Sequence, residues 1–346
     1  MDSSIAAILL LDGLTNGIVY GLIAIALVLV FTVTRILFIP QGEFVAFGAL
    51  TLAMLQQGQR PGPLWLLLIL ACCAAAMQTT ALLRAGQAAR LPRVLANTLG
   101  LPLAIAALVW WAAPQQFPLP VQVALTLLLI TALGPLLYQV VFESMADASV
   151  LQLLIVSVGI HLAMTGLGLV FFGAEGFRTP AFWDERWNIG ALTLSAQTLV
   201  VVGAACALLL ALWLFSGYTL YGKALRATAV NRLGARLMGI STTLAGKLSF
   251  AVAAFIGALS GVLIGPMSTI FYDSGFLIGL KGFVAATIGA LASFPLAAGG
   301  ALLVGLLESF SSFWASDYKE VIVFMALLPI LLWRSLVTPA HDEDEE

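Results

Sequence analysis

The chain has 346 residues, of which 61% are hydrophobic and only 9% are charged, and its mean hydropathy is +1.06. Because soluble domains carry about 25% charged residues, this composition excludes a soluble globular protein and indicates a membrane protein. The formal net charge of -2, from 15 Lys and Arg against 17 Asp and Glu, excludes a strongly basic chain, and we expect no nucleic-acid partner.

Apolar segments fill most of the chain and predict an all-α fold, a polytopic membrane helical bundle of about 10–11 spans in one domain, 1–346. A membrane helix needs about 20 mainly apolar residues. The first segment has no preceding basic region and is too long for a signal peptide, so we expect it to be retained. Two segments, 43–57 and 276–294, are short or polar enough to be re-entrant. The candidate spans lie near 5–34, 43–57, 64–83, 95–112, 121–141, 148–172, 195–217, 243–265, 276–294, 297–314 and 319–335.

The positions of Lys and Arg predict the orientation. If every candidate crosses the membrane, most of these cations lie on one side, which is then cytoplasmic. The N-terminus is expected outside and the C-terminus in the cytoplasm, where 336–346 forms a solvated acidic tail. The outer segment 173–190 mixes aromatic and charged residues, and we favour an interfacial aromatic belt over a docking ledge for an external protein.

The stretch 218–247 is the most basic part of the chain and contains no acid, which predicts a large cytoplasmic loop. Asn231 can cap a short helix there, and Gly239 can end it in the left-handed conformation. Such a helix can lie on anionic lipid, act as a positive-inside anchor or fit a groove on a cytoplasmic partner. Opposite Arg232 and Arg236, its apolar face is formed by Leu233, Leu237 and Met238.

Several polar residues lie inside the candidate spans, where an ionisable group costs at least about 2.5 kcal/mol. Each is therefore a candidate for a translocation pathway, although a pairing between Lys281 and a carboxylate would also offset that cost. His161 stands alone on an apolar segment and is best explained as a satisfied core histidine, while Asp273 can be a solvated cap. The pathway candidates are Asn16, Tyr20, Gln41, Glu43, Lys281 and Glu308.

Glycines at intervals of four predict faces of close helix packing. Neither a hydrolase nor a zinc-protease motif occurs, and there is no dinucleotide- or phosphate-binding glycine loop. We therefore expect no catalytic residue, no metal site and no cofactor bound by this chain. The packing glycines are Gly257, Gly261 and Gly265 in the span 243–265, and Gly13, Gly17 and Gly21 in the first span.

Short motifs along the chain resemble those of the branched-chain amino acid permease family of ABC importers. One part of 218–247 resembles the ATPase-coupling segment of such membrane subunits. Its matching residues are Gly222, Arg226-Ala227, Ala229, Asn231, Ala235 and Gly239-Ile240. The first span is similar through Gly13-x-x-x-Gly17-x-x-Tyr20. Further similar motifs, in chain order, are Gly42-Glu43, Gly279-x-Lys281-x-Phe283, Gly305-x-x-Glu308 and Asp317-Tyr318-Lys319.

This resemblance implies a pore-forming ABC-importer permease in the bacterial cytoplasmic (inner) membrane. It would move a branched-chain or other amino acid, or a related amide, urea or organic acid, inward by alternating access. The implied partners are a second homologous permease subunit in a heterodimer, two cytoplasmic ATPase subunits that hydrolyse the ATP, an extracytoplasmic solute-binding protein and membrane lipid. Segment 218–242 would couple to the ATPase through Gly222, Arg226, Ala227, Asn231, Ala235 and Gly239.

The chain also departs from that family's pattern. Segment 38–41 reads Phe-Ile-Pro-Gln where the family has Asn-Phe-Ala-His, and the turn 142–147 carries two acids where cations are expected. Segment 84–120 resembles an insertion of two extra spans. These departures indicate a divergent relative and leave the solute open. The rival interpretations are an ion-coupled secondary transporter, which would use Glu43, Lys281 and Glu308, and a membrane scaffold without transport.

Overall fold

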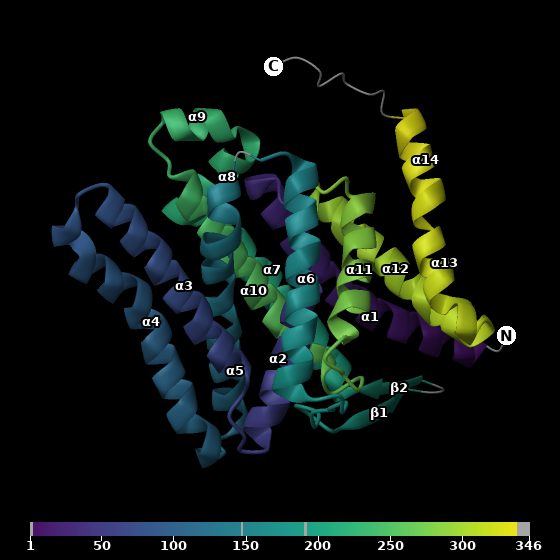
Figure 1. Cartoon of the computed structure of the whole chain (residues 1–346). Coiled ribbons are helices and arrows are strands. Elements are labelled where there is room, and N and C mark those ends of the chain that lie inside the picture. Colours follow the sequence, from purple (N-terminus) through teal and green to yellow (C-terminus); the bar gives the residue numbers. More distant parts are fainter. Residues whose placement is uncertain (1–2, 147, 190–191, 338–346) are drawn as a thin grey trace.

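The computed structural model describes residues 3–146, 148–189 and 192–337, and it confirms the predicted all-α membrane bundle (Figure 1). A small antiparallel hairpin pairs β1 (Arg186–Ile189) with β2 (Leu192–Ser195). The helices are α1 (Ser3–Thr34), α2 (Gln41–Gln56), α3 (Pro63–Arg84), α4 (Leu91–Ala112), α5 (Leu119–Leu137), α6 (Val150–Phe172), α7 (Ala196–Tyr218), α8 (Leu220–Val230), α9 (Arg232–Leu237), α10 (Thr242–Ile264), α11 (Ser274–Ile288), α12 (Phe294–Trp314), α13 (Lys319–Met325) and α14 (Leu327–Val337).

Among the described residues, eight helices are long and apolar enough to cross a membrane, and the other predicted spans are shorter helices. The segments expected to be short are α2 and α11, which have 16 and 15 residues. The predicted span 319–335 is divided at Ala326 into α13 and α14. Pro329 explains the division, because a proline ring clashes with the carbonyl four residues earlier, here that of Met325. The acidic end, 338–346, lies outside the described residues.

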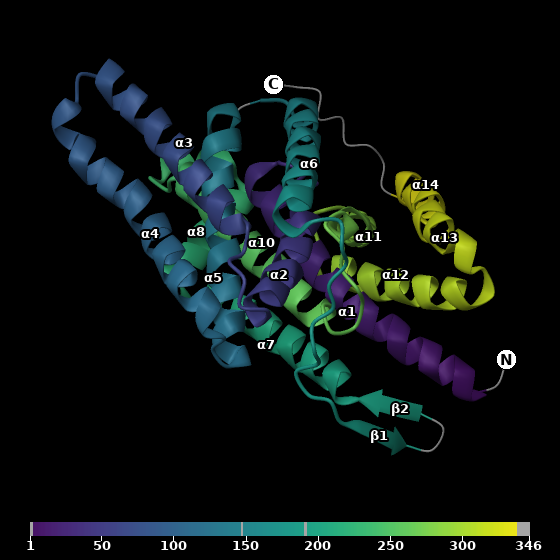
Figure 2. The same cartoon turned by 60° about the horizontal axis from the view of Figure 1, so that its bottom comes forward.

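Segment 84–120 contains one long helix, α4, rather than the two inserted spans that we predicted. The reason is length, since two spans of about 20 residues each and their connecting turn do not fit between these bounds. Helix α4 instead returns alongside α3, and both helices pack against α5 at one side of the bundle (Figures 1 and 2).

The centre of the bundle consists of α1, α2, α5, α10, α11 and α12. Helices α1 and α12 come from opposite ends of the sequence and lie side by side (Figure 2). Helices α6 and α7 are largely exposed at the outside, as expected for surfaces that face lipid or a partner. Helices α8 and α9 lie at one end of the bundle, and the hairpin β1–β2 lies at the other (Figure 1).

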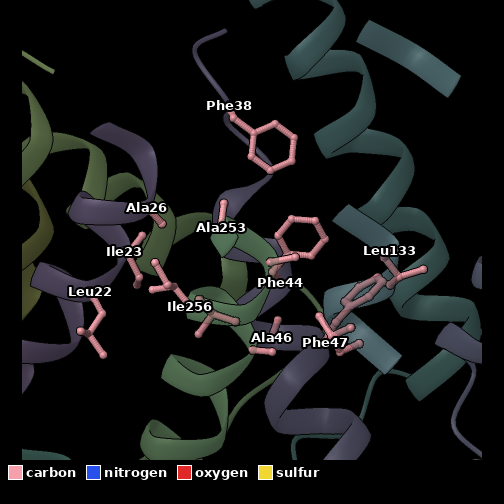
Figure 3. Close-up of a cluster of buried hydrophobic side chains, with 14 of the residues drawn as sticks. Leu22, Ile23, Ala26, Phe38, Phe44, Ala46, Phe47, Leu133, Ala253 and Ile256 are labelled. Carbon is pink, nitrogen blue, oxygen red and sulfur yellow. The ribbon is translucent and has the colours of Figure 1, made fainter. Parts of the chain in front are cut away.

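Aromatic side chains fill the core where α2 meets α5 and α10 (Figure 3). Phe38, Phe44 and Phe250 are all buried, and the ring of Phe38 lies 4.8 Å from that of Phe250 and 5.7 Å from that of Phe44. The departure at 38–41 therefore has a structural role, because Phe38 is a core residue. Gln41, at the end of the same segment, donates from Nε2 to the carbonyl oxygen of Ala253 at 2.9 Å and fastens α2 to α10.

All the predicted packing glycines except Gly265 lie at helix contacts. A Cβ on Gly257 would lie 2.7 Å from Cβ of Phe44, and one on Gly261 would overlap the carbonyl oxygen of Val45. These glycines therefore let α10 approach the α2 backbone closely. Gly265 instead faces Thr179 in the loop before α7. The second seam, between α1 and α12, is formed by Gly13, Gly17 and Gly305.

Gly261→Leu should destabilise the bundle, because the new side chain would have to displace the α2 backbone. Overpacking a tight core costs about 1 to 3 kcal/mol, and a backbone neighbour cannot move aside as a side chain can. The measurement is the yield of monodisperse detergent-solubilised protein. Gly203→Leu on α7 is the matched control, since a Cβ at Gly203 meets nothing within 4 Å. Equal yields for the two variants would contradict a tight α2–α10 seam.

Candidate functional site

A partly buried charge network links Tyr20, Lys281, Glu308 and Glu320, which come from α1, α11, α12 and α13. The Lys281 side chain is 6% exposed, and its Nζ donates to Oε1 of Glu308 at 2.6 Å and to Oε1 of Glu320 at 3.0 Å. The hydroxyl of Tyr20 donates to the other oxygen of Glu308 at 2.5 Å. The cation that the sequence places inside a span is thus paired with carboxylates, which offsets its burial cost.

This charge network holds the α1–α12 seam to α11 and α13. Both oxygens of Glu308 have a donor within the chain. Sequence reasoning missed Glu320, the second acceptor of Lys281. Glu320 directly follows the Asp317-Tyr318-Lys319 motif and stands at the start of an apolar segment. This position could have identified Glu320 as a candidate.

A second polar cluster joins α2 to α6. Glu43 is completely buried, and its Oε1 lies 2.9 Å from Nδ1 of His161. The hydroxyl of Thr165, one turn after His161, donates to the same carboxylate oxygen at 3.3 Å. The imidazole also stacks on the ring of Phe276 in α11, with 4.7 Å between centroids. His161 is therefore a buried, paired histidine, and its partner is one of the pathway candidates.

The remaining intramembrane candidates lie apart from both clusters. Asn16 is half-buried one turn before Tyr20 on α1, and its side chain makes no hydrogen bond within the described part of the chain. Asp273 is exposed at the N-cap position of α11, as expected for a solvated cap. Of the pathway candidates, Tyr20, Lys281 and Glu308 therefore belong to the charge network, and Glu43 belongs to the pair with His161. Gln41 instead bonds to α10.

The segment 218–242 folds into α8 and α9, whose ends are defined by local hydrogen bonds. The Thr219 hydroxyl accepts from the Gly222 amide at 2.9 Å and caps α8, and the Asn231 side chain accepts from the Gly234 amide at 2.8 Å and caps α9. Gly239 follows α9 with φ 81°, a left-handed conformation that favours glycine. The chain then turns into α10.

The small residues of this segment do not all face outward. A Cβ on Gly222 would overlap the carbonyl oxygen of Phe215, and Ala235 is only 5% exposed. Their small size therefore serves packing within the chain, while Arg226, Asn231 and Gly239 are exposed. Four exposed apolar side chains on and beside α9 form a surface that we call the coupling tip: Val230 (87% exposed), Leu233 (68%), Leu237 (80%) and Met238 (83%).

Basic side chains attach the segment 218–247 to neighbouring elements. Arg226 donates to the Ser216 hydroxyl at the end of α7, and Arg232 donates to the carbonyl oxygen of Ala146, each at 3.0 Å. Lys247 lies 3.2 Å from the carboxylate of Glu143. The turn after α5 therefore contacts this segment at two points.

A family model described as the permease component of the branched-chain amino acid transport system matches residues 9–109 and 95–331. The chain belongs to this family. With eight long apolar helices among its described residues, this permease is a multi-pass protein of the inner membrane.

Curated relatives share about a quarter to a third of their residues with the permease over the aligned part. LivH of Salmonella typhimurium, a high-affinity branched-chain amino acid transport system permease protein, is 29% identical over 216 residues, which cover 60% of this chain and 69% of LivH. BraD of Pseudomonas aeruginosa, with the same description, is 25% identical over 218 residues, covering 61% and 71%. Among solved structures, PsaBC from Streptococcus pneumoniae in complex with Fab aligns with a TM-score of 0.44 and 13% identity, over 95% of this chain and 91% of that chain.

The structure gives a physical reason for one departure of this permease from the expected motifs. The turn 142–147 carries acids where cations were expected, and one of them, Glu143, pairs with Lys247. The other, Asp147, lies outside the described residues. The acid at 143 therefore complements the basic charge of the segment beside it.

Proposed function

We propose that this permease is the pore-forming subunit of an ATP-driven ABC importer that moves a small solute into the cytoplasm by alternating access. Branched-chain amino acids are the first candidates, because LivH and BraD are described as permease proteins of high-affinity branched-chain amino acid transport. Other small amino acids and related amides, urea or organic acids remain candidates, since the apolar interior contains few charges.

The observation that carries this proposal is the coupling tip. Protein surfaces that face water rarely expose a large apolar patch unless it binds a partner, and here Leu237 and Met238, in a basic segment at the end of the bundle, are about four-fifths exposed. The surrounding segment is basic, so it suits the cytoplasmic side of the membrane. We propose that α8 and α9 insert into a groove on a cytoplasmic ATPase subunit, an example of helix-in-groove recognition.

The position of α8 and α9 also bears on the orientation of the chain and on its remaining partners. With α8 and α9 in the cytoplasm, the hairpin β1–β2 lies at the opposite end, where it would meet an extracytoplasmic solute-binding protein (Figure 1). The N-terminus would be outside and the C-terminus in the cytoplasm. A second homologous permease would cover exposed apolar helices and complete the pathway, and two ATPase subunits would supply the ATP hydrolysis.

The test is purification of the tagged chain from its native membrane, followed by reconstitution of the complex in proteoliposomes. We expect nucleotide-binding subunits and a second permease to co-purify. We also expect leucine uptake to require ATP and the solute-binding protein. Uptake driven by a sodium or proton gradient, with no nucleotide-binding subunit present, would identify an ion-coupled transporter instead.

A further inference from the structure

A cavity of about 470 Å³ lies between α6 and α11 and is lined almost entirely by apolar side chains. Its volume falls within the range of about 300 to 1,000 Å³ that is usual for small-ligand pockets. It opens at the surface of the chain, because Leu162 is 65% exposed and Phe276 is 39% exposed. Phe38 and Phe283 contribute aromatic walls, and His161 contributes the polar atoms.

The imidazole of His161 is held in a defined position. Its Nδ1 faces the buried carboxylate of Glu43 at 2.9 Å, and its ring stacks on Phe276. In the tautomer that carries its proton on Nδ1, beside this carboxylate, the other ring nitrogen, Nε2, is a hydrogen-bond acceptor. Glu43 keeps one oxygen, Oε2, without a hydrogen-bond partner among the described residues, so its charge is only partly compensated.

This combination suits one class of ligand. A buried carboxylate behind an acceptor nitrogen attracts an ammonium group, and the aromatic faces of Phe276 and Phe283 add to that attraction. The apolar walls suit an aliphatic side chain. No Lys or Arg lines the cavity, so an acidic side chain would have no cation to pair with and would be repelled by Glu43.

We propose that this cavity binds the transported solute through its ammonium group and its aliphatic side chain, with Nε2 of His161 as the acceptor. This inference rests on the proposed transport of a small amino acid and goes further, because it assigns part of the selectivity to the permease itself. The permease would favour neutral aliphatic amino acids over acidic ones.

Saturation-transfer NMR on the whole complex in nanodiscs, without the solute-binding protein, tests the proposal because it detects weak ligands. The probes are L-leucine, L-leucinamide, which lacks the carboxylate, and 4-methylpentanoate, which lacks the amine. We expect signals from leucine and leucinamide and at least a tenfold weaker signal from 4-methylpentanoate. An equal signal from 4-methylpentanoate, or no signal from leucine, would overturn the proposal.

Two cavity variants and one control variant test whether leucine binds in this cavity. His161→Phe removes the acceptor but keeps an aromatic ring, and Leu162→Trp adds bulk to the cavity from a position that is 65% exposed. Both should lower the leucine signal at least tenfold, whereas Val170→Trp, on an outward position of α6 that is 77% exposed, should leave it unchanged. Unchanged leucine signals in both cavity variants would overturn the proposal.

The uptake assay separates failure of this inference from failure of the proposed function. If the wild-type complex imports leucine with ATP while both cavity variants bind and import it normally, the inference fails and the proposed function stands. If the wild-type complex imports no neutral aliphatic amino acid, the proposed substrate class fails, and the inference fails with it.

Discussion

Replacing Lys281 with methionine should remove most of the folded permease from the membrane. The substitution leaves Glu308 and Glu320 close together with no cation between them, and Glu308 is only 14% exposed. Removing one partner of a buried ion pair costs about 3 to 5 kcal/mol, because the other charge stays buried without compensation. The measurement is the amount of monodisperse protein after solubilisation, together with its thermal stability.

The control for this variant neutralises the entire network. In Lys281→Met combined with Glu308→Gln and Glu320→Gln, no uncompensated charge remains, and the amide of residue 308 can still accept from Tyr20. The triple variant should recover much of the folded yield that the single variant loses. A normal yield for Lys281→Met alone would show that the charge network does not hold α11, α12 and α13 together. Recovery of folding without recovery of uptake would indicate that the charges also act in transport.

Leu237→Asp should abolish ATP-driven uptake while the chain still folds and inserts. Leu237 is 80% exposed in the permease alone, so an aspartate there costs the isolated chain little. In the proposed complex the same position is buried in an ATPase groove. Loss of a buried leucine costs about 1.5 to 3 kcal/mol, which weakens association about 10- to 100-fold. An unpaired carboxylate in that groove weakens it further.

Co-purification of the ATPase subunits measures this effect, and uptake in proteoliposomes gives the functional readout. The matched control is Leu237→Met, which keeps an apolar side chain of similar volume and should retain both association and uptake. If Leu237→Asp binds the ATPase and supports uptake at the wild-type rate, with a normal amount of folded protein, then the coupling tip is not the ATPase contact.

The positions of the helices could be predicted from the sequence because membrane insertion depends on local hydropathy. Each apolar segment corresponds to a helix, and even the two short segments, 43–57 and 276–294, were recognised as unusual. The caps of α9 were also predictable, since the Asn231 side chain bonds to an amide only three residues away. The division at Ala326 was missed because the hydropathy of 319–335 is continuous, although Pro329 marks it.

The polar clusters could be predicted only in part. The sequence singled out Glu43, Lys281 and Glu308 because each interrupts an apolar segment. It left open whether Lys281 contacts a solute or a carboxylate, and it explained His161 as a satisfied core histidine without naming its partner. Which helix lies opposite another is decided by packing across the whole bundle, so these partners cannot be read from spacing along one helix.

The sequence alone determined the membrane location, the helical fold class and the basic character of the segment 218–247, because these properties follow from composition and from contacts within a few residues. The tertiary structure decided that Glu43 meets His161 and that Lys281 joins Glu308 to Glu320. It also decided that Gly222 and Ala235 face inward while the apolar coupling tip faces outward. The physical reason is that burial of a side chain depends on which distant segments cover it, and that is a property of the assembled bundle.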